Sequence, residues 1–171
     1  MNKSTLTRLG LIALAAVVAF TWYQYRQPRF RSGDKAADFE ATLIDGRKTH
    51  LSELNGKYTL LQFWGSWCGP CRAENPALAD IYRTYSGQGF EIFSIGIESS
   101  PAAWRRAIQM DGLIWPYHAM ESQDFGGEAS RLFNIKTIPA TFLLDPEGTI
   151  IGVNLPPEKI KKTLSERLAG R

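Results

Sequence analysis

Cysteine and histidine are both scarce in this chain of 171 residues, which contains only Cys68 and Cys71, His50 and His118. Without a second cysteine pair there is no network of structural disulfides, so the fold depends on its apolar core. A structural zinc site is disfavoured, because it takes four ligands and both histidines are distant in sequence from the cysteines. A bridge within the short segment CGPC closes a very small loop and gains little from chain entropy. The sequence therefore favours a redox-active dithiol over a structural bridge.

Acidic residues are absent from the first 33 positions, which carry five basic ones. The other 138 residues hold 15 basic and 17 acidic side chains, so the positive charge of the chain belongs to its amino terminus. No basic surface for nucleic acid is indicated, and no nucleic-acid partner is expected. The length fits one domain with a short appendage, and there is no internal repeat or low-complexity tract.

A long hydrophobic run occurs at the amino terminus, where residues 9–20 are apolar and the segment TWYQY continues to Tyr25. A helix over residues 9–25 is roughly 25 Å long at 1.5 Å per residue, against about 30 Å for the hydrocarbon core of a bilayer. A cleavable signal peptide could use the small residue Ala19. The aromatic residues of TWYQY, followed by arginines, instead indicate the interfacial belt of a retained anchor. We favour a retained anchor that contacts the lipid bilayer through residues 9–25.

Strand and helix patterns alternate along the rest of the chain. The segments 59–64 and 90–97 are continuous apolar runs, as expected of strands buried on both faces. A helix is expected from beside Cys68 to about Tyr85. The other expected elements are an edge strand at 39–44, a helical turn at 51–57, a helix from Pro101 to about Met110, a short strand within 114–120, a short helix at 128–134, a hairpin of 140–145 and 149–153, and a last helix from about Glu158. This order predicts an α/β fold with a central mixed β-sheet flanked by helices.

The two cysteines are expected to differ in reactivity. Cys68 stands where a helix presents unpaired backbone N–H groups and the positive end of its dipole, which stabilise a thiolate and lower the pKa of the thiol. Cys71 lies one turn further, on the same side of the helix and more buried. We therefore expect Cys68 to attack a substrate disulfide and Cys71 to resolve the mixed disulfide.

Two polar residues near the dithiol have two interpretations each. Glu74 lies one turn beyond Cys71, where a half-buried carboxyl group could exchange a proton with the resolving thiol; alternatively, it is a solvated helix residue. Gln62 is a polar residue in an apolar strand and needs a partner. We interpret it as a structural contact, with the positioning of water near Cys71 as the alternative.

The segments FWGSWCGPCRAENP and TIPATFLLDPEG carry a family resemblance. From about Gly33 to the end, the chain resembles the thioredoxin superfamily and, within it, the membrane-anchored TlpA/ResA-like thiol-disulfide oxidoreductases. The resemblance implies a thioredoxin fold with an N-terminal extension and a central helix-strand insert between Ile97 and Phe125. It divides the chain into an anchor or signal peptide at 1–26, a linker at 27–32 and a thioredoxin-like domain at 33–171.

The same resemblance implies roles for individual residues. Pro139 matches the cis-proline that lies beside the dithiol, and the backbone at Ile138 is expected to pair with an extended substrate. Glu74 matches the acidic residue that ResA-like members carry. The departure is Gln62, which replaces the buried acid of thioredoxin. Around the dithiol, the residues expected to contact substrate with Ile138 and Pro139 are Trp67, Gly69 and Pro70.

The resemblance implies an extracytoplasmic enzyme that reduces protein disulfides, in a setting such as cytochrome c maturation. It would be held at the cell membrane by a single N-terminal anchor, with the domain on the periplasmic side. Its partners would be a protein with a disulfide or CxxC dithiol and a membrane electron donor. No cofactor and no metal is expected.

Two alternatives from other classes remain. A copper-binding chaperone of the same fold would use both cysteines and a histidine, since thiolates suit Cu(I), but such chaperones place more residues between their cysteines. A peroxiredoxin-like peroxidase needs its cysteine in a proline-threonine context, which FWGSWC does not supply. His50 and His118 are instead expected to be ordinary surface or loop residues. Trp104, Trp115 and Tyr117 are expected to pack within the central insert.

Overall fold

The computed structural model describes residues 3–26, 29–122 and 124–169. The helices are α1 (Lys3–Arg26), α2 (Gly69–Tyr85), α3 (Pro101–Met110), α4 (Glu128–Leu132) and α5 (Pro157–Leu168), with the 3₁₀ turns η1 (Leu51–Leu54) and η2 (Ser86–Gln88). The strands are β1 (Glu40–Thr42), β2 (Lys48–His50), β3 (Tyr58–Trp64), β4 (Phe90–Glu98), β5 (Tyr117–Ser122), β6 (Ala140–Leu144) and β7 (Ile150–Val153). This order confirms the expected mixed α/β architecture.

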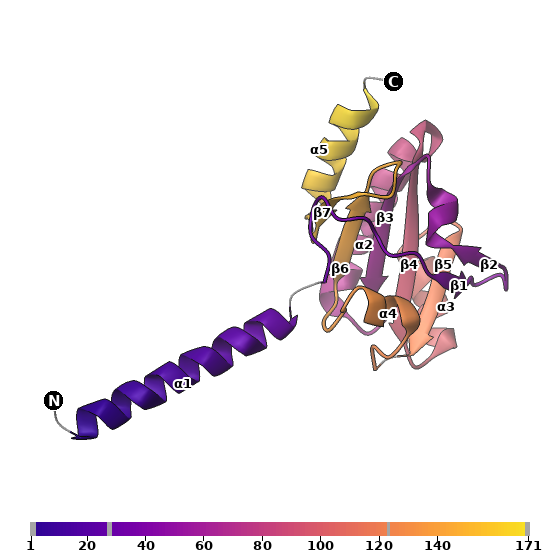
Figure 1. Cartoon of the computed structure of the whole chain (residues 1–171). Coiled ribbons are helices and arrows are strands. Elements are labelled where there is room, and N and C mark those ends of the chain that lie inside the picture. Colours follow the sequence, from indigo (N-terminus) through magenta and orange to yellow (C-terminus); the bar gives the residue numbers. More distant parts are fainter. Residues whose placement is uncertain (1–2, 27–28, 123, 170–171) are drawn as a thin grey trace.

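A five-stranded sheet in the order β5-β4-β3-β6-β7 forms the centre of the domain (Figure 1). Strand β3 pairs in parallel with β4 and antiparallel with β6, and β4 pairs in parallel with β5. Every residue of β3 and β4 is buried, which agrees with their continuous apolar sequences. The last two strands form the expected antiparallel hairpin.

Each face of this sheet is covered by its own apolar cluster. Helices α2, α3 and α5 pack on one face, where their side chains meet alternate residues of β3 such as Leu60 and Trp64. The other face carries α4, η1 and the segment before β1, and its centre is a group of phenylalanines: Phe39, Phe63, Phe93, Phe133 and Phe142. Because successive side chains of β3 point to opposite faces of the sheet, this strand contributes to both apolar clusters.

The N-terminal extension differs in detail from the expectation. The strand expected at 39–44 is shorter and forms a separate two-stranded sheet with β2, a strand that the sequence did not indicate. The reversal occurs at Gly46, which has a φ of +87°, and at Asp45, whose side chain accepts a hydrogen bond from the backbone N–H of Arg47. The residue after β1, Leu43, bridges to Ala119 on β5, at one edge of the five-stranded sheet.

The segment that precedes this small sheet packs on the domain. The N–H of Arg29 donates to the carbonyl of Phe133, and the ring of Phe30 lies 4.9 Å from that of Phe133. Further along, the N–H of Gly33 donates to the carbonyl of Ile150 on β7. The contact of Gly33 covers part of the sheet edge at β7.

The central insert consists of α3, the following loop and β5. Trp104 and Trp115 are buried, as expected for packing residues, and Tyr117 stacks on Phe93 with 5.9 Å between ring centroids. The serine at position 100 caps α3 by accepting a hydrogen bond from the N–H of Ala103. The insert therefore packs as part of the domain core.

The expectation of a surface or loop position is wrong for His118. It lies on β5 with only 2% of its surface exposed, stacked on Trp115 at 5.3 Å between ring centroids. Its Nε2 atom is 3.3 Å from the carbonyl oxygen of Leu113. Burial lowers the pKa of this imidazole from 6.5 to about 4, because the charged form loses its hydration.

Replacing His118 with Phe should make the protein less sensitive to acid. As pH falls below 6.5, the unfolded chain binds a proton that the folded protein binds only near pH 4, so the wild type loses stability in this window. The loss at pH 4 is roughly 3 kcal/mol at about 1.4 kcal/mol per pKa unit. Urea unfolding from pH 7 to pH 4 measures it. Equal pH slopes for the two proteins would contradict the assignment.

Candidate functional site

The dithiol lies where β3 ends and α2 begins, at the carboxyl end of the central parallel strands. Cys68 is the N-cap residue of α2, with extended backbone angles, and its Sγ accepts a hydrogen bond of 3.3 Å from the N–H of Cys71. The two cysteines form a disulfide with 5.3 Å between their Cα atoms. Pro70 occupies the first turn of the helix, where a missing N–H costs nothing. This geometry places Cys68 at a helix terminus that favours a thiolate once the disulfide is reduced.

Access to the two sulfurs differs. Cys71 is fully buried, whereas Cys68 is 5% exposed and is flanked by the exposed Gly69 and Pro70. The neighbouring Trp67 is 56% exposed. A substrate can therefore approach the pair only from the side of Cys68.

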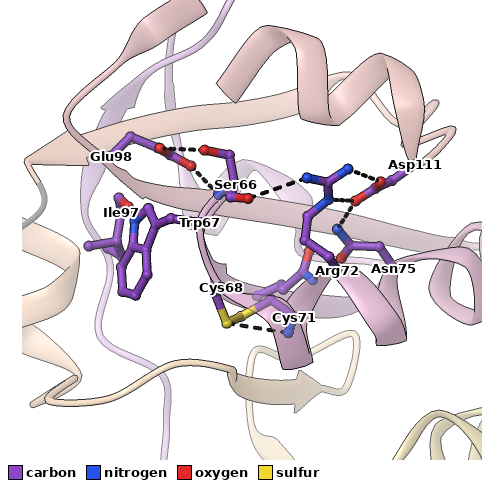
Figure 2. The surroundings of a disulfide bond; sticks show 10 residues. Ser66, Trp67, Cys68, Cys71, Arg72, Asn75, Ile97, Glu98 and Asp111 are labelled. Atoms are coloured by element: carbon purple, nitrogen blue, oxygen red, sulfur yellow. Dashed lines mark hydrogen bonds and ion pairs between the residues drawn. A yellow bond between two sulfur atoms is a disulfide. The ribbon is translucent and has the colours of Figure 1, made fainter. Parts of the chain in front are cut away.

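Trp67 is nevertheless held in place on one edge. Its Nε1–H donates a hydrogen bond of 2.7 Å to the carbonyl of Ile97 at the end of β4 (Figure 2). A Cβ atom at Gly65 would lie only 2.9 Å from the same indole nitrogen, so this position needs glycine. The indole thus forms a fixed, exposed apolar surface beside Cys68.

The peptide bond between Ile138 and Pro139 is cis and lies beside the dithiol loop, as expected. Strand β6 begins at Ala140, which pairs with Phe63 on β3, so the two preceding residues reach the sheet end where Cys68 stands. The Cδ1 atom of Ile138 would be 3.2 Å from a Cβ atom at Gly65, which places its side chain against the same loop. Two segments more than 60 residues apart in sequence therefore form one edge of the site.

Glu74 is half-buried on α2, one turn beyond Cys71. It lines a cavity of about 160 Å³ together with residues of β6 and the loop after β7, namely Pro139, Thr141, Asn154, Leu155 and Pro156. Burial raises the pKa of its carboxyl group, because the carboxylate loses hydration. The carboxyl group therefore shares a cavity with the cis-proline.

Gln62 makes the structural contacts that were expected. Its amide Nε2 donates to Asn75 on α2 at 3.0 Å, and its Oε1 accepts a hydrogen bond of 2.8 Å from the hydroxyl of Ser94 on β4. All three residues are buried. The amide thereby satisfies its polar atoms between the sheet and the active-site helix.

A group of polar residues around the dithiol loop was missed in the sequence (Figure 2). Glu98 is 4% exposed and accepts hydrogen bonds from both the backbone N–H and the hydroxyl of Ser66. Arg72 donates from Nη1 to the carbonyl of Ser66 and from Nη2 to Asp111, the latter at 2.6 Å. The position of Arg72 directly after Cys71 was the available signal. Its partner is 39 residues away in sequence, and no pattern indicated it.

The two histidines lie in different surroundings. His50 is exposed on β2, 3.2 Å from a carboxylate oxygen of Asp38. Within residues 3–26, 29–122 and 124–169, no group of three or more His, Cys, Asp or Glu side chains is arranged to hold a metal ion.

Comparisons with known proteins agree with this site. The family model described as the AhpC/TSA family matches residues 32–153. A thiol-disulfide oxidoreductase ResA from Bacillus cereus is 30% identical over 170 residues, which span 98% of this chain and 95% of the relative. The chain belongs to the ResA-like thiol-disulfide oxidoreductases of the AhpC/TSA family.

Further comparisons support the same assignment of this ResA-like protein. ResA from Bacillus subtilis is 29% identical over 146 residues, covering 84% of this chain and 79% of the relative. The thioredoxin domain of a thiol-disulfide oxidoreductase from Bacteroides vulgatus superposes with a TM-score of 0.74 at 26% identity, over 81% of this chain and 99% of that one. The ResA-like chain is thus an oxidoreductase with a thioredoxin fold, and the expected family is confirmed.

Glu74→Gln should change the pH dependence of disulfide exchange while leaving the fold intact. The variant keeps the size of the side chain but removes a negative charge one turn from Cys71. We therefore expect lower apparent thiol pKa values, and we expect the change to flatten the pH dependence of resolution by Cys71 more than that of attack by Cys68. Stopped-flow measurements across neutral pH separate the two steps. Asp80→Asn, on the exposed side of the same helix, is the matched control. Overlapping profiles for wild type and Glu74→Gln would make Glu74 a solvated helix residue.

Proposed function

We propose that this ResA-like protein is a membrane-anchored reductase of protein disulfides, in which Cys68 is the nucleophile. The observation that carries the proposal is the N-cap position of Cys68, whose sulfur accepts the N–H of Cys71 at 3.3 Å while Cys71 is fully buried. The sulfur at the helix terminus is the one whose thiolate is stabilised and accessible. The buried sulfur is suited to the second, internal step.

The reaction consists of two thiol-disulfide exchanges. The thiolate of Cys68 attacks one sulfur of the substrate disulfide, forms a mixed disulfide and releases the other substrate sulfur, which takes up a proton. Cys71 then loses its proton and attacks Cys68, and the second substrate thiol leaves. The protein ends as the Cys68–Cys71 disulfide, and the substrate has gained two electrons and two protons. The carboxyl group of Glu74, one turn beyond Cys71 on α2, is proposed to accept the proton of Cys71.

The substrate is proposed to be an extended protein segment. It would lie between the indole of Trp67 and the backbone at Ile138, next to Pro139, with Gly69 and Pro70 leaving room above Cys68. Gly69 has no atom within 4 Å of an added Cβ, which fits an open approach to the sulfur. Such a segment would be bound mainly through its backbone and its disulfide, as in peptides that pair with the edge of a sheet.

Helix α1 is proposed to be a retained membrane anchor, with the domain on the extracytoplasmic side. Its segment Arg8–Tyr25 is long and apolar enough to cross a bilayer, and none of it is buried within the protein. A reductase outside the cytoplasm must be re-reduced after each turnover, so we propose a membrane-bound dithiol as electron donor. The resemblance to ResA-like proteins supports cytochrome c maturation as the setting, with the CxxC haem-binding site of an apocytochrome as substrate.

Single cysteine variants test the proposal. Cys68→Ser should abolish the reduction of insulin disulfides by the dithiothreitol-reduced full chain in detergent. Cys71→Ser should still attack but accumulate as a mixed disulfide, visible by non-reducing electrophoresis and mass spectrometry. Faster alkylation of Cys71 than of Cys68 at neutral pH in the reduced wild type would show that the roles are reversed.

A further inference from the structure

A continuous hydrogen-bonded chain connects the central insert to the dithiol loop. It starts at Trp115, whose indole N–H donates to Ser94 on β4, and Ser94 donates to Gln62 on β3. From there the amide of Gln62 donates to Asn75 on α2, and Asn75 donates to Asp111, directly after α3, at 2.7 Å. The distances along this chain lie between 2.7 and 3.0 Å. Each residue donates to the next one in the same direction, and the chain ends at the carboxylate of Asp111.

Asp111 also forms an ion pair with Arg72 on the active-site helix α2. Arg72 approaches it with Nε and Nη2 together, and the side chains are 28% and 9% exposed (Figure 2). The third contact of the guanidinium is the carbonyl of Ser66, two residues before Cys68. A paired geometry of this kind is both strong and directional. The carboxylate thus fixes where the positive charge of Arg72 lies relative to Cys68.

The other charges near the site are distributed over the surrounding elements. The charged side chains on the elements that surround Cys68 are Arg72, Glu74, Asp80 and Arg83 on α2, Glu91 and Glu98 on β4, Asp111 after α3 and Lys136 before β6. Arg72 is the cation on the active-site helix nearest in sequence to the dithiol. An unpaired arginine there would stabilise the Cys68 thiolate, and with it the reduced protein. Asp111 opposes this effect.

We propose that Asp111 is a positioning residue of the central insert that neutralises Arg72 and thereby keeps the Cys68/Cys71 couple reducing. The proposal rests on the proposed reductase function of the dithiol and adds a role for the insert. The carboxylate anchors Arg72 away from the sulfur, and Arg72 in turn holds the carbonyl of Ser66. The insert therefore sets the charge at the nucleophile through one ion pair.

The test is the equilibrium of the full-length protein in detergent with glutathione. In this reaction the Cys68–Cys71 bond forms, the S–S bond of glutathione disulfide breaks, and two glutathione thiols take up the two electrons and two protons. Asp111→Asn should shift the equilibrium roughly three- to tenfold towards the reduced protein, which equals about 15 to 30 mV. This difference between Asp111→Asn and the wild type should reach its full size above the pKa of Cys68. It should vanish at lower pH, where the thiol is uncharged.

The pH dependence separates charge from shape, since a purely structural defect would shift the equilibrium at every pH. Asp80→Asn removes a negative charge from an exposed pair with Arg83 on the same helix and should change nothing. The double variant Arg72→Gln/Asp111→Asn removes both charges and should return to the wild-type equilibrium. Asp111→Glu should remain closer to wild type than Asp111→Asn.

The outcomes distinguish this inference from the proposed function. Suppose that the wild type exchanges with glutathione and that Asp111→Asn folds but has the same equilibrium as the wild type at every pH. This result would overturn the role of Asp111 and leave the proposed reductase function standing. If Asp111→Asn does not fold, Arg72→Gln replaces it: the unpaired carboxylate should then shift the equilibrium towards the oxidised protein above the thiol pKa. An unchanged equilibrium in that variant also overturns the proposal. A wild type that does not exchange at all contradicts the reductase function itself.

Discussion

The geometry of the site depends on the complete burial of β3 between two layers. Because its seven residues are buried on both faces, the strand cannot slip in register without exposing apolar side chains. The carboxyl end of β3 therefore fixes the position of Cys68, at the start of α2 and beside the carboxyl end of β4. The antiparallel partner β6 brings the cis-proline to the same point from the other end of the chain. The registers of β3 with β4 and with β6 together fix the position of Cys68 relative to the cis-proline.

The central insert also helps to hold the dithiol loop in position. Asp111 and Trp115 come from the insert, yet their hydrogen bonds pass through β4, β3 and α2 to the dithiol loop. The polar chain crosses a core in which each unsatisfied group would cost free energy, so its members constrain one another. On the other side of the loop, Glu98 binds Ser66. The loop before Cys68 is consequently held by charged groups from two elements, while the substrate side stays open.

The fold and the position of the cysteine pair at the start of a helix were largely predictable from sequence, because their signals are local. The apolar runs of β3 and β4, the capping Ser100 and the CGPC segment each act within one element. The cis-proline at position 139 was implied by the family resemblance. The partners of the dithiol loop were not predictable, since the pairing of Arg72 with Asp111 and of Ser66 with Glu98 depends on tertiary placement over more than 30 residues. His118 was misjudged for a related reason: its burial is set by Trp115 and the edge of the sheet, not by its own polarity.

We propose that a membrane-anchored thioredoxin fold uses this dithiol to reduce other proteins. The most direct measurement is the reduction potential of the Cys68/Cys71 couple at neutral pH, obtained by equilibrating the full-length protein with glutathione or dithiothreitol and quantifying the free thiols. We predict a value close to that of thioredoxin, about −270 mV. A value near −120 mV, which is typical of the strong oxidant DsbA, would contradict the account and make the protein a donor of disulfides.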